Sequence, residues 1–451
     1  MVNTMGSAAG QKRGCTGNLI ILRHPIWRAT RGIAVDTGTW GDLYRSVQRP
    51  QACPVMTGFN ANIDRIIPVT PGVLLALRQQ TGPGFQPLLG RLEHSMRYCL
   101  ADEMVIGDPA VFHAISGFFS ATGSLTPGGQ AGIAAIQMRR LNFTPVTCAV
   151  PGAGPRTRTM LRDAGVLPLT FAPETVDNPD NIHLVFEYSP GLVPVAEGVV
   201  PRVNRFIVSP AHEPSTILIP EEREAAFLEQ IASCRRAFLS GYQYLRTEEE
   251  FIAAAGQLAR IRSVHPRMRT HVECVSGIQP QILRMMLDHI LQHTDSIGLN
   301  EQELDIFHRA SGAPEQKPPV VTDSSPVALV RDAIAFAHAT GVPRLHLHTF
   351  GYYILVKKPG TGQPELSRNA LLFAAQEAAG AAGGSDTTLS PEGLMAYAAV
   401  RAASGPEETP GIFRIGDRIV VIIPTLVARY NRKTTGLGDI LSSTAFVADP
   451  F

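Results

Sequence analysis

Apolar positions are organised in short runs that alternate with longer segments of helical periodicity. From residue 222 onward the alternation is regular, with helices expected at 222–235, 247–263, 279–292 and 326–340, each followed by a strand at 237–240, 269–274, 296–299 and 344–348. Strands that alternate with helices of this length predict an α/β fold with a mostly parallel sheet covered by helices on both faces.

The first half of the chain continues this pattern and then interrupts it. The same criteria predict strands at 54–58 and 145–150 and helices at 40–47, 84–102, 108–118, 133–141 and 157–164. The strands expected at 182–188 and 205–209 instead alternate between apolar and polar positions, which is typical of a sheet with one face in solvent. We therefore expect a large domain of residues 37–65, 111–169 and 216–451, a smaller domain of residues 66–110 and 170–215, and a poorly ordered extension over residues 1–36.

Composition excludes several classes of protein. Among 451 residues, 40 Lys and Arg balance 39 Asp and Glu, so the charge argues against a nucleic-acid binder. The chain has no apolar run long enough for a membrane span. Its six cysteines are scattered without a C-x-x-C pair, which fits reduced thiols in a cytoplasmic protein rather than a zinc site. The five lysines include no Gly-Lys-Ser or Gly-Lys-Thr, and this excludes a Walker A loop.

The sharpest motif is Thr434-Thr-Gly436-Leu-Gly438-Asp439, which precedes an apolar helix. Glycines at a helix start leave backbone N–H groups accessible, and together with the helix dipole they favour an anion such as a phosphoryl group. A carboxylate at Asp439 could accept a proton from an attacking hydroxyl. The alternative is that Asp439 only stabilises the start of the helix.

Two other glycine- and amide-containing segments suit a polyhydroxyl ligand. Asn62 and Asp64 follow the first strand, and amide and carboxylate groups there can donate to and accept from sugar hydroxyls. Gly129 and Gln130, in Gly-Gly-Gln-Ala-Gly, open a helix and permit close backbone approach to a ligand. The alternatives are an Asx-rich turn and tight helix packing, respectively.

Acidic residues follow two predicted strands, as His271-Val-Glu273 and Asn300-Glu-Gln-Glu303. Carboxylate and amide oxygens without cysteine suit a hard cation such as Mg²⁺ held through water. The alternative for Asn300 and Glu303 is a capping box at a helix start.

Two further positions suit a nucleotide. His348 and Thr349 lie with aromatic residues at a strand end and could line a base pocket, the alternative being core packing. Arg205, with Arg202 near it, could meet phosphate oxygens from the smaller domain, the alternative being an ordinary surface arginine.

Taken together and in order, these segments resemble the ADP-dependent sugar kinases, a family of phosphofructokinases and glucokinases within the ribokinase-like superfamily. The resemblance spans roughly residues 40–451 and rests on GFNANID (58–64), GGQAGI (128–133), IHLVFEY (182–188), NRFI (204–207), HVE (271–273), NEQE (300–303), HLHTFGYY (346–353) and TTGLGD (434–439). It implies a ribokinase-like large domain and a smaller α/β lid.

The resemblance also implies roles for individual residues. Asp439 is similar to the family's catalytic base, and Gly436 and Gly438 to its anion hole. The other implied sites are Mg²⁺ at Glu273, Glu303 and Asp439; sugar at Asn62, Asp64, Glu103, Gly129, Gln130 and His183; and nucleotide at Asn300, His348, Thr349, Val427, Gly438 and Arg205. Family members often carry Asn where Gln130 stands.

The activity implied is transfer of the β-phosphate of ADP to a sugar hydroxyl, most simply that of fructose 6-phosphate, with release of AMP. An acidic lid residue favours glucose in this family, and Glu103 could supply it, so glucose is a second substrate or the main one. Two further functions fit the same motifs, namely an ATP-dependent ribokinase-like kinase and a catalytically silent sugar- or nucleotide-binding protein. As partners we expect only sugar or sugar phosphate and ADP, without nucleic acid or membrane, in a monomer or small homo-oligomer.

Overall fold

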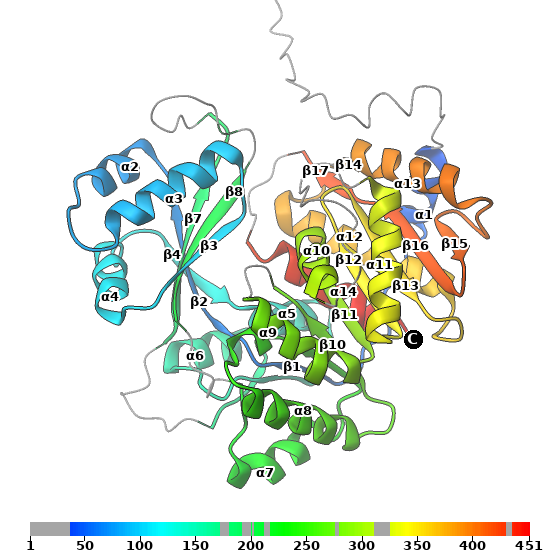
Figure 1. Ribbon diagram of the computed structural model, residues 1–451, viewed down its shortest axis with the longest axis horizontal. Helices are drawn as coiled ribbons and strands as arrows, with labels where there is room; N and C mark the ends of the chain where they lie inside the picture. The colour runs from blue at the N-terminus through cyan, green and yellow to red at the C-terminus, as the bar shows by residue number, and fades with distance from the viewer. Residues whose placement is uncertain are drawn as a thin grey trace, which may run out of the picture.

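A computed structural model describes residues 37–171, 180–191, 200, 203–211, 217–275, 279–310, 325–429 and 435–451. The predicted extension over residues 1–36, Arg202 and Thr434 lie outside these ranges. Two sheets with their own helices stand beside each other, the larger on the right and the smaller at the upper left in Figure 1.

The larger body is built on a ten-stranded sheet in the order β15-β16-β13-β12-β11-β10-β9-β1-β5-β6. Six of its nine neighbouring pairs are parallel, from β12 across to β6. Buried apolar strands such as β16 show that both faces are covered, which confirms the predicted fold class. The strands are β1 (Val55–Gly58), β5 (Val146–Ala149), β6 (Leu167–Leu169), β9 (Arg236–Leu239), β10 (Arg269–Glu273), β11 (Ser296–Asn300), β12 (Arg344–His348), β13 (Tyr352–Lys357), β15 (Ile412–Ile415) and β16 (Arg418–Pro424).

Helices pack against this sheet in two rows. One row contains α5 (Gln130–Arg140), α14 (Leu437–Ala448) and α12 (Pro364–Gly383), with α1 (Thr37–Arg45) packed on α12. The other contains α8 (Glu248–Ser263), α9 (Pro280–Met285), α10 (Glu301–Ala310), α11 (Pro326–Thr340) and α13 (Pro391–Ser404). The remaining helices are α6 (Pro155–Asp163) and α7 (Glu221–Ile231).

One predicted helix is shorter than expected. The helix predicted at 279–292 is α-helical only over α9, and it continues as a π turn, Met286–Ile290, and a 3₁₀ turn, Leu291–His293. None of the helices in the described part of the chain is both long and apolar enough to cross a membrane.

The smaller body is a five-stranded sheet in the order β3-β8-β7-β2-β4. Its strands are β2 (Asn62–Pro68), β3 (Asp102–Ile106), β4 (Ser124–Gly128), β7 (Ile182–Tyr188) and β8 (Asn204–Pro210). The helices α2 (Pro71–Arg78), α3 (Phe85–Tyr98) and α4 (Pro109–Phe118) pack on it around a separate apolar core that includes Leu88, Leu92 and Phe186. We call this body the lid.

The lid sheet extends beyond the segments from which it was predicted. Strand β4 and the start of β2 fall in ranges that the sequence pattern assigned to the large domain, because short strands next to glycines carry no signal of which sheet they join. A two-stranded ribbon, β14 (Thr387–Leu389) and β17 (Leu426–Ala428), completes the structure.

Candidate active site

The site lies where three parallel strands end under the first turn of α14. In the parallel register Glu273 of β10 stands opposite Gly298, and Asn300 of β11 stands opposite His348 of β12. Helix α14 begins after Gly436, whose φ of 74° is the left-handed conformation that favours glycine, and Asp439 lies in the first turn. A methyl group on Gly438 would be 3.4 Å from His348 Nε2. The turn that carries Asp439 therefore faces the strand ends from which the nucleotide and Mg²⁺ positions were predicted.

Glu273 is the centre of the acidic part of the site. Its carboxylate is buried, accepts a hydrogen bond from Ser442 Oγ, and lies 3.0 Å from His271 Nε2 and 4.0 Å from His348 Nε2. Burial raises the pKa of Glu273 well above its usual range, and the negative charges of Glu303 and Asp439 raise it further. Three carboxylates from three different elements thus act on one another at this sheet edge.

The capping alternative for Asn300 and Glu303 is present in the structure. Asn300 Oδ1 accepts from the backbone N–H of Glu303 at 2.9 Å, while the Glu303 carboxylate accepts from the backbone N–H of Asn300 at 2.8 Å and from its Nδ2 at 2.9 Å. This reciprocal cap starts α10. It also holds the buried Glu303 carboxylate at the strand end, so capping and a role in the site are compatible.

The predicted sugar positions gather at one end of the lid sheet. Asn62 Nδ2 donates to Asp64 Oδ1 at 2.7 Å, and Asp64 stands beside His183 in the parallel register of β2 and β7. A methyl group on Gly128 would lie 2.2 Å from Asp64 Oδ1. Gly129 has a φ of 75°, and a methyl group on it would lie 2.6 Å from the carbonyl oxygen of Asn60. These glycines therefore permit the close approach of β4 to β2 that places the polar side chains together.

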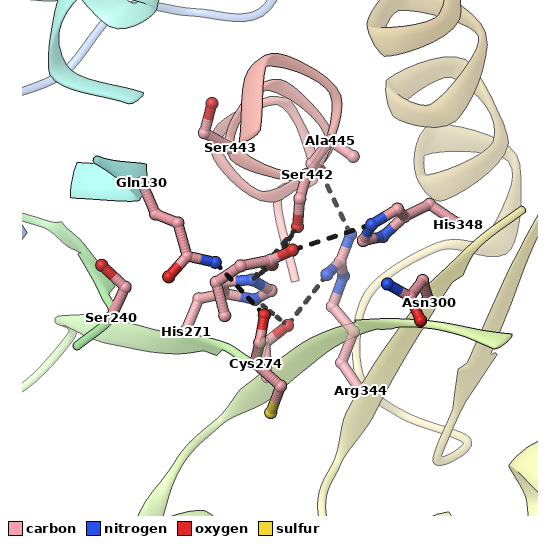
Figure 2. A network of polar contacts seen from close by, with 12 residues as sticks. Gln130, Ser240, His271, Cys274, Asn300, Arg344, His348, Ser442, Ser443 and Ala445 are labelled. Carbon is pink, nitrogen blue, oxygen red and sulfur yellow. Dashed lines mark hydrogen bonds and ion pairs between the residues drawn. The ribbon is translucent and has the colours of Figure 1, made fainter. Parts of the chain in front are cut away.

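Gln130 links the sugar positions to the acidic residues. It is the first residue of α5, and its Nε2 donates to the carbonyl of Cys274 at 3.2 Å, directly after Glu273. Figure 2 shows Gln130 on the same side of the sheet as Ser442 and His271. The sugar end of the lid and the end of β10 are thus joined by one side chain.

Glu103 lies on β3, the edge strand of the lid sheet opposite β4, and it is also close to the predicted sugar positions. Its Oε1 accepts from Ser209 Oγ at 2.6 Å, and burial raises its pKa although this hydrogen bond and the charge of Arg205 lower it. Burial chiefly raises the pKa of the Tyr244 hydroxyl, and the charges of Glu103 and Asp64 add to it. Both predicted sugar-side acids are therefore close enough to Tyr244 to act on its hydroxyl electrostatically.

The lid also contacts the glycine turn before α14. Thr435 Oγ1 donates to Glu187 Oε1 of β7 at 3.0 Å. Glu187 is in turn the cross-strand partner of Arg205 on β8. Glu187 therefore connects the predicted lid arginine, its cross-strand neighbour, to the residue that precedes Gly436 of the predicted anion hole.

The remaining nucleotide positions lie at the edge of the site. Thr349 begins the turn between β12 and β13, where its backbone N–H and Oγ1 both donate to Tyr352 O, at 3.2 and 2.7 Å. Burial lowers the pKa of His348 to about 4, so its imidazole is neutral at neutral pH. Val427 lies opposite Thr388 on the two-stranded ribbon, which is separate from the strand that carries His348.

Three residues that contact the site were missed in the sequence. Tyr244 lies in a 3₁₀ turn (Tyr242–Tyr244) after β9, where no periodicity marks it. Ser442 is a polar residue on a buried face of α14. Gly298 offered a signal, because a glycine inside an apolar strand indicates close approach of another group.

A mostly parallel sheet, a lid sheet and an acidic residue on a glycine-led helix beyond the strand ends define a phosphotransferase of the ribokinase-like class. Residues 54–448 match the model of the ADP-specific phosphofructokinase/glucokinase conserved region. The chain belongs to this family, which confirms the resemblance found in the sequence. It is an ADP-dependent phosphotransferase that acts on a sugar hydroxyl.

Three distant relatives match over nearly their full length. The chain is 27% identical to an ADP-dependent glucose/glucosamine kinase of Pyrococcus furiosus over 91% of this chain and 98% of that protein. It is 25% identical to an ADP-specific phosphofructokinase of Pyrococcus horikoshii, covering 88% and 98%. A solved ADP-dependent kinase in complex with fructose 6-phosphate and ADPβS superposes with a TM-score of 0.75 at 25% identity, covering 91% and 96%.

Proposed function

We propose that this protein transfers the β-phosphoryl group of ADP to the free primary hydroxyl of fructose 6-phosphate, producing fructose 1,6-bisphosphate and AMP, and that glucose is a second substrate. The observation that carries the proposal is the position of Asp439, in the first turn of α14 and within electrostatic reach of Glu273. In the reaction the sugar oxygen bonds to the β-phosphorus, the bond to the bridging oxygen breaks, and Asp439 takes the hydroxyl proton.

The other residues supply charge and position. Backbone N–H groups after Gly436 meet the transferred group, and Arg205 approaches the phosphates from the lid. The contact between Thr435 and Glu187 keeps the lid against the glycine turn, so that water is excluded. Asn62, Asp64, Gly129, Gln130 and His183 hold the sugar, whereas Asn300, His348, Thr349 and Val427 lie on the nucleotide side.

Mg²⁺ fits the acidic residues by charge, because Glu303 and Asp439 lie close enough to Glu273 to raise its pKa beyond the larger effect of its burial. Within the described ranges, no three His, Cys, Asp or Glu side chains are arranged to hold a metal ion directly. We therefore propose that these carboxylates hold Mg²⁺ through water. When bound, Mg²⁺ would neutralise phosphate charge.

A specific observation favours glucose as an acceptor as well. Glu103 is a buried carboxylate near Tyr244 and Asp64, and such a group can accept hydrogen bonds from sugar hydroxyls. An ADP-dependent glucokinase is therefore the second candidate function, and a silent binding protein of the same fold is the third.

The test is AMP formation from ADP with fructose 6-phosphate, with glucose and without sugar, repeated with ATP as donor. We expect AMP with fructose 6-phosphate, a lower rate with glucose, and no sugar phosphorylation from ATP. Turnover with glucose alone would show a glucokinase. Sugar binding by calorimetry without any AMP would show a binding protein.

A further inference from the structure

Behind Glu273 a line of buried polar side chains crosses three strands (Figure 2). Arg344 Nη1 lies 2.8 Å from Ser296 Oγ, Ser296 Oγ lies 2.8 Å from His271 Nδ1, and His271 Nε2 lies 3.0 Å from Glu273 Oε2. None of the four side chains is more than 3% exposed. Solvent therefore does not compete for these hydrogen bonds.

Arg344 sets the direction of the whole line. A guanidinium can only donate, so Ser296 Oγ accepts from Arg344, and its single proton goes to His271 Nδ1, the other polar atom within hydrogen-bond distance among the described residues. A neutral imidazole that accepts at Nδ1 carries its proton on Nε2, which then donates to Glu273 Oε2. The far side of the guanidinium is held by Asp449 Oδ2 at 2.9 Å and by the carbonyl of Ala445 at 3.2 Å. The arginine thus has no freedom to turn away.

The same carboxylate oxygen receives a second donor. Ser442 Oγ donates to Glu273 Oε2, and Figure 2 shows Ser442 pointing from α14 toward His271 while Ser443 points away. With Oε2 held by two donors, the other oxygen, Oε1, is the one turned toward His348, at 4.0 Å from Nε2. The hydrogen bonds from His271 and Ser442 to Oε2 therefore determine that Oε1 is the oxygen of Glu273 that faces the reacting groups.

We propose that Arg344, Ser296 and Ser442 are positioning residues that fix the Nε2–H tautomer of His271 and hold Glu273 with Oε2 anchored and Oε1 presented to the site. This inference rests on the proposed function for its effect on turnover. Groups behind a metal-associated side chain commonly change affinity or activity by about 10- to 100-fold when removed, because they fix the orientation of that side chain.

Ser296→Ala and Ser442→Ala are the test variants, and Ser443→Ala is the matched control. Ser443 is equally buried, but among the described residues its side chain bonds only within α14, to the carbonyl of Ile440 at 3.3 Å. We expect kcat with ADP and sugar to fall about tenfold or more in both test variants, with sugar KM little changed and the Mg²⁺ concentration for half-maximal rate raised. Ser443→Ala should behave as wild type. An equal loss in all three variants would overturn the proposal.

A second readout does not depend on turnover. Two-bond ¹H–¹⁵N spectra of histidine-labelled protein report which ring nitrogen carries the proton, with a His271→Asn variant to assign the signal. We expect Nε2–H in wild type and in Glu273→Gln, because the Ser296 hydroxyl still donates to Nδ1, and a mixed or Nδ1–H form in the double variant Ser296→Ala/Glu273→Gln, in which neither neighbour specifies the tautomer. An Nδ1–H form in wild type, or retention of Nε2–H in the double variant, would overturn the proposal. If wild type showed no ADP-dependent turnover, the proposed function would fail, and these spectra would still decide whether the tautomer is fixed.

Discussion

The carboxylate of Glu273 lies against the backbone of Gly298 on the neighbouring strand. A methyl group on residue 298 would stand 2.0 Å from Glu273 Oε2 and 2.7 Å from both His271 Nε2 and Ser442 Oγ. No side chain larger than hydrogen fits there unless Glu273 moves. The glycine therefore makes the space in which the acid is held.

Gly298→Ala should consequently lower both stability and activity. We expect a loss of about 1–3 kcal/mol in the free energy of unfolding, because the methyl group overfills a packed site, and a fall in kcat from the displaced carboxylate. Gly380→Ala is the control, since the methyl group meets nothing within 4 Å on α12 and should be neutral or stabilising. Urea unfolding and initial rates measure both; a wild-type kcat in Gly298→Ala would contradict the assignment.

Asp439→Asn should separate binding from chemistry. Asparagine keeps the shape of the side chain but cannot take the hydroxyl proton, so we expect kcat to fall by about 10²–10⁴-fold. Calorimetry should show sugar affinity close to wild type. Asp417→Asn, at a side chain 71% exposed in the turn between β15 and β16, is the control. A near-normal kcat in Asp439→Asn would show that another group is the base.

Glu273→Gln should weaken Mg²⁺ binding. Glutamine can still accept from Ser442 but carries no charge, so less attraction for the cation remains at this edge. We expect a higher Mg²⁺ concentration for half-maximal rate and weaker Mg²⁺ binding by calorimetry. Glu365→Gln, exposed in the first turn of α12, should leave both unchanged. An unaltered Mg²⁺ titration in Glu273→Gln would count against its role.

Glu103→Gln should discriminate between the two sugars. Loss of the carboxylate removes an acceptor for glucose hydroxyls, so kcat/KM for glucose should fall by about tenfold or more, as for hydrogen bonds to charged groups. The value for fructose 6-phosphate should change little. Glu93→Gln, at a lid acid paired with Arg78 at 3.0 Å on the outer helices, is the control. Equal losses for both sugars would mean that Glu103 only supports the lid.

The buried histidine His346 should make the protein sensitive to acid. Its pKa lies well below 6.5 because of burial and the charge of Arg344, and neither ring nitrogen has a hydrogen-bond partner among the described residues. The His346 imidazole therefore stays neutral in the folded protein, whereas in the unfolded chain it takes up a proton below about pH 6.5. The free energy of unfolding consequently falls as the pH falls.

His346→Leu removes this proton uptake by the unfolded chain. Between pH 7.5 and 5.5 the variant should lose about 1.4 kcal/mol less unfolding free energy than wild type. Urea unfolding at the two pH values is the measurement. An identical pH dependence in His346→Leu would contradict the depressed pKa.

The regular second half of the chain was predictable from local pattern. Helix α11 and strand β12 have the predicted bounds, because the buried residues of α11 recur at helical spacing and β12 is a short run of buried residues with clear ends. Pattern did not show which sheet β4 joins. It also did not indicate the 3₁₀ turn of Tyr244, since a single turn has no period to detect.

The sequence by itself determined the alternating fold, the family and the residues with reactive side chains, because these follow from composition, periodicity and short motifs along the chain. Only the tertiary structure decided how those residues meet. Glu273 has its partners on α14, β11 and β12, and Glu103 reaches Tyr244 from the lid. Such contacts join residues up to 248 positions apart, as in Thr435 and Glu187, and depend on strand order and register, which no local pattern specifies.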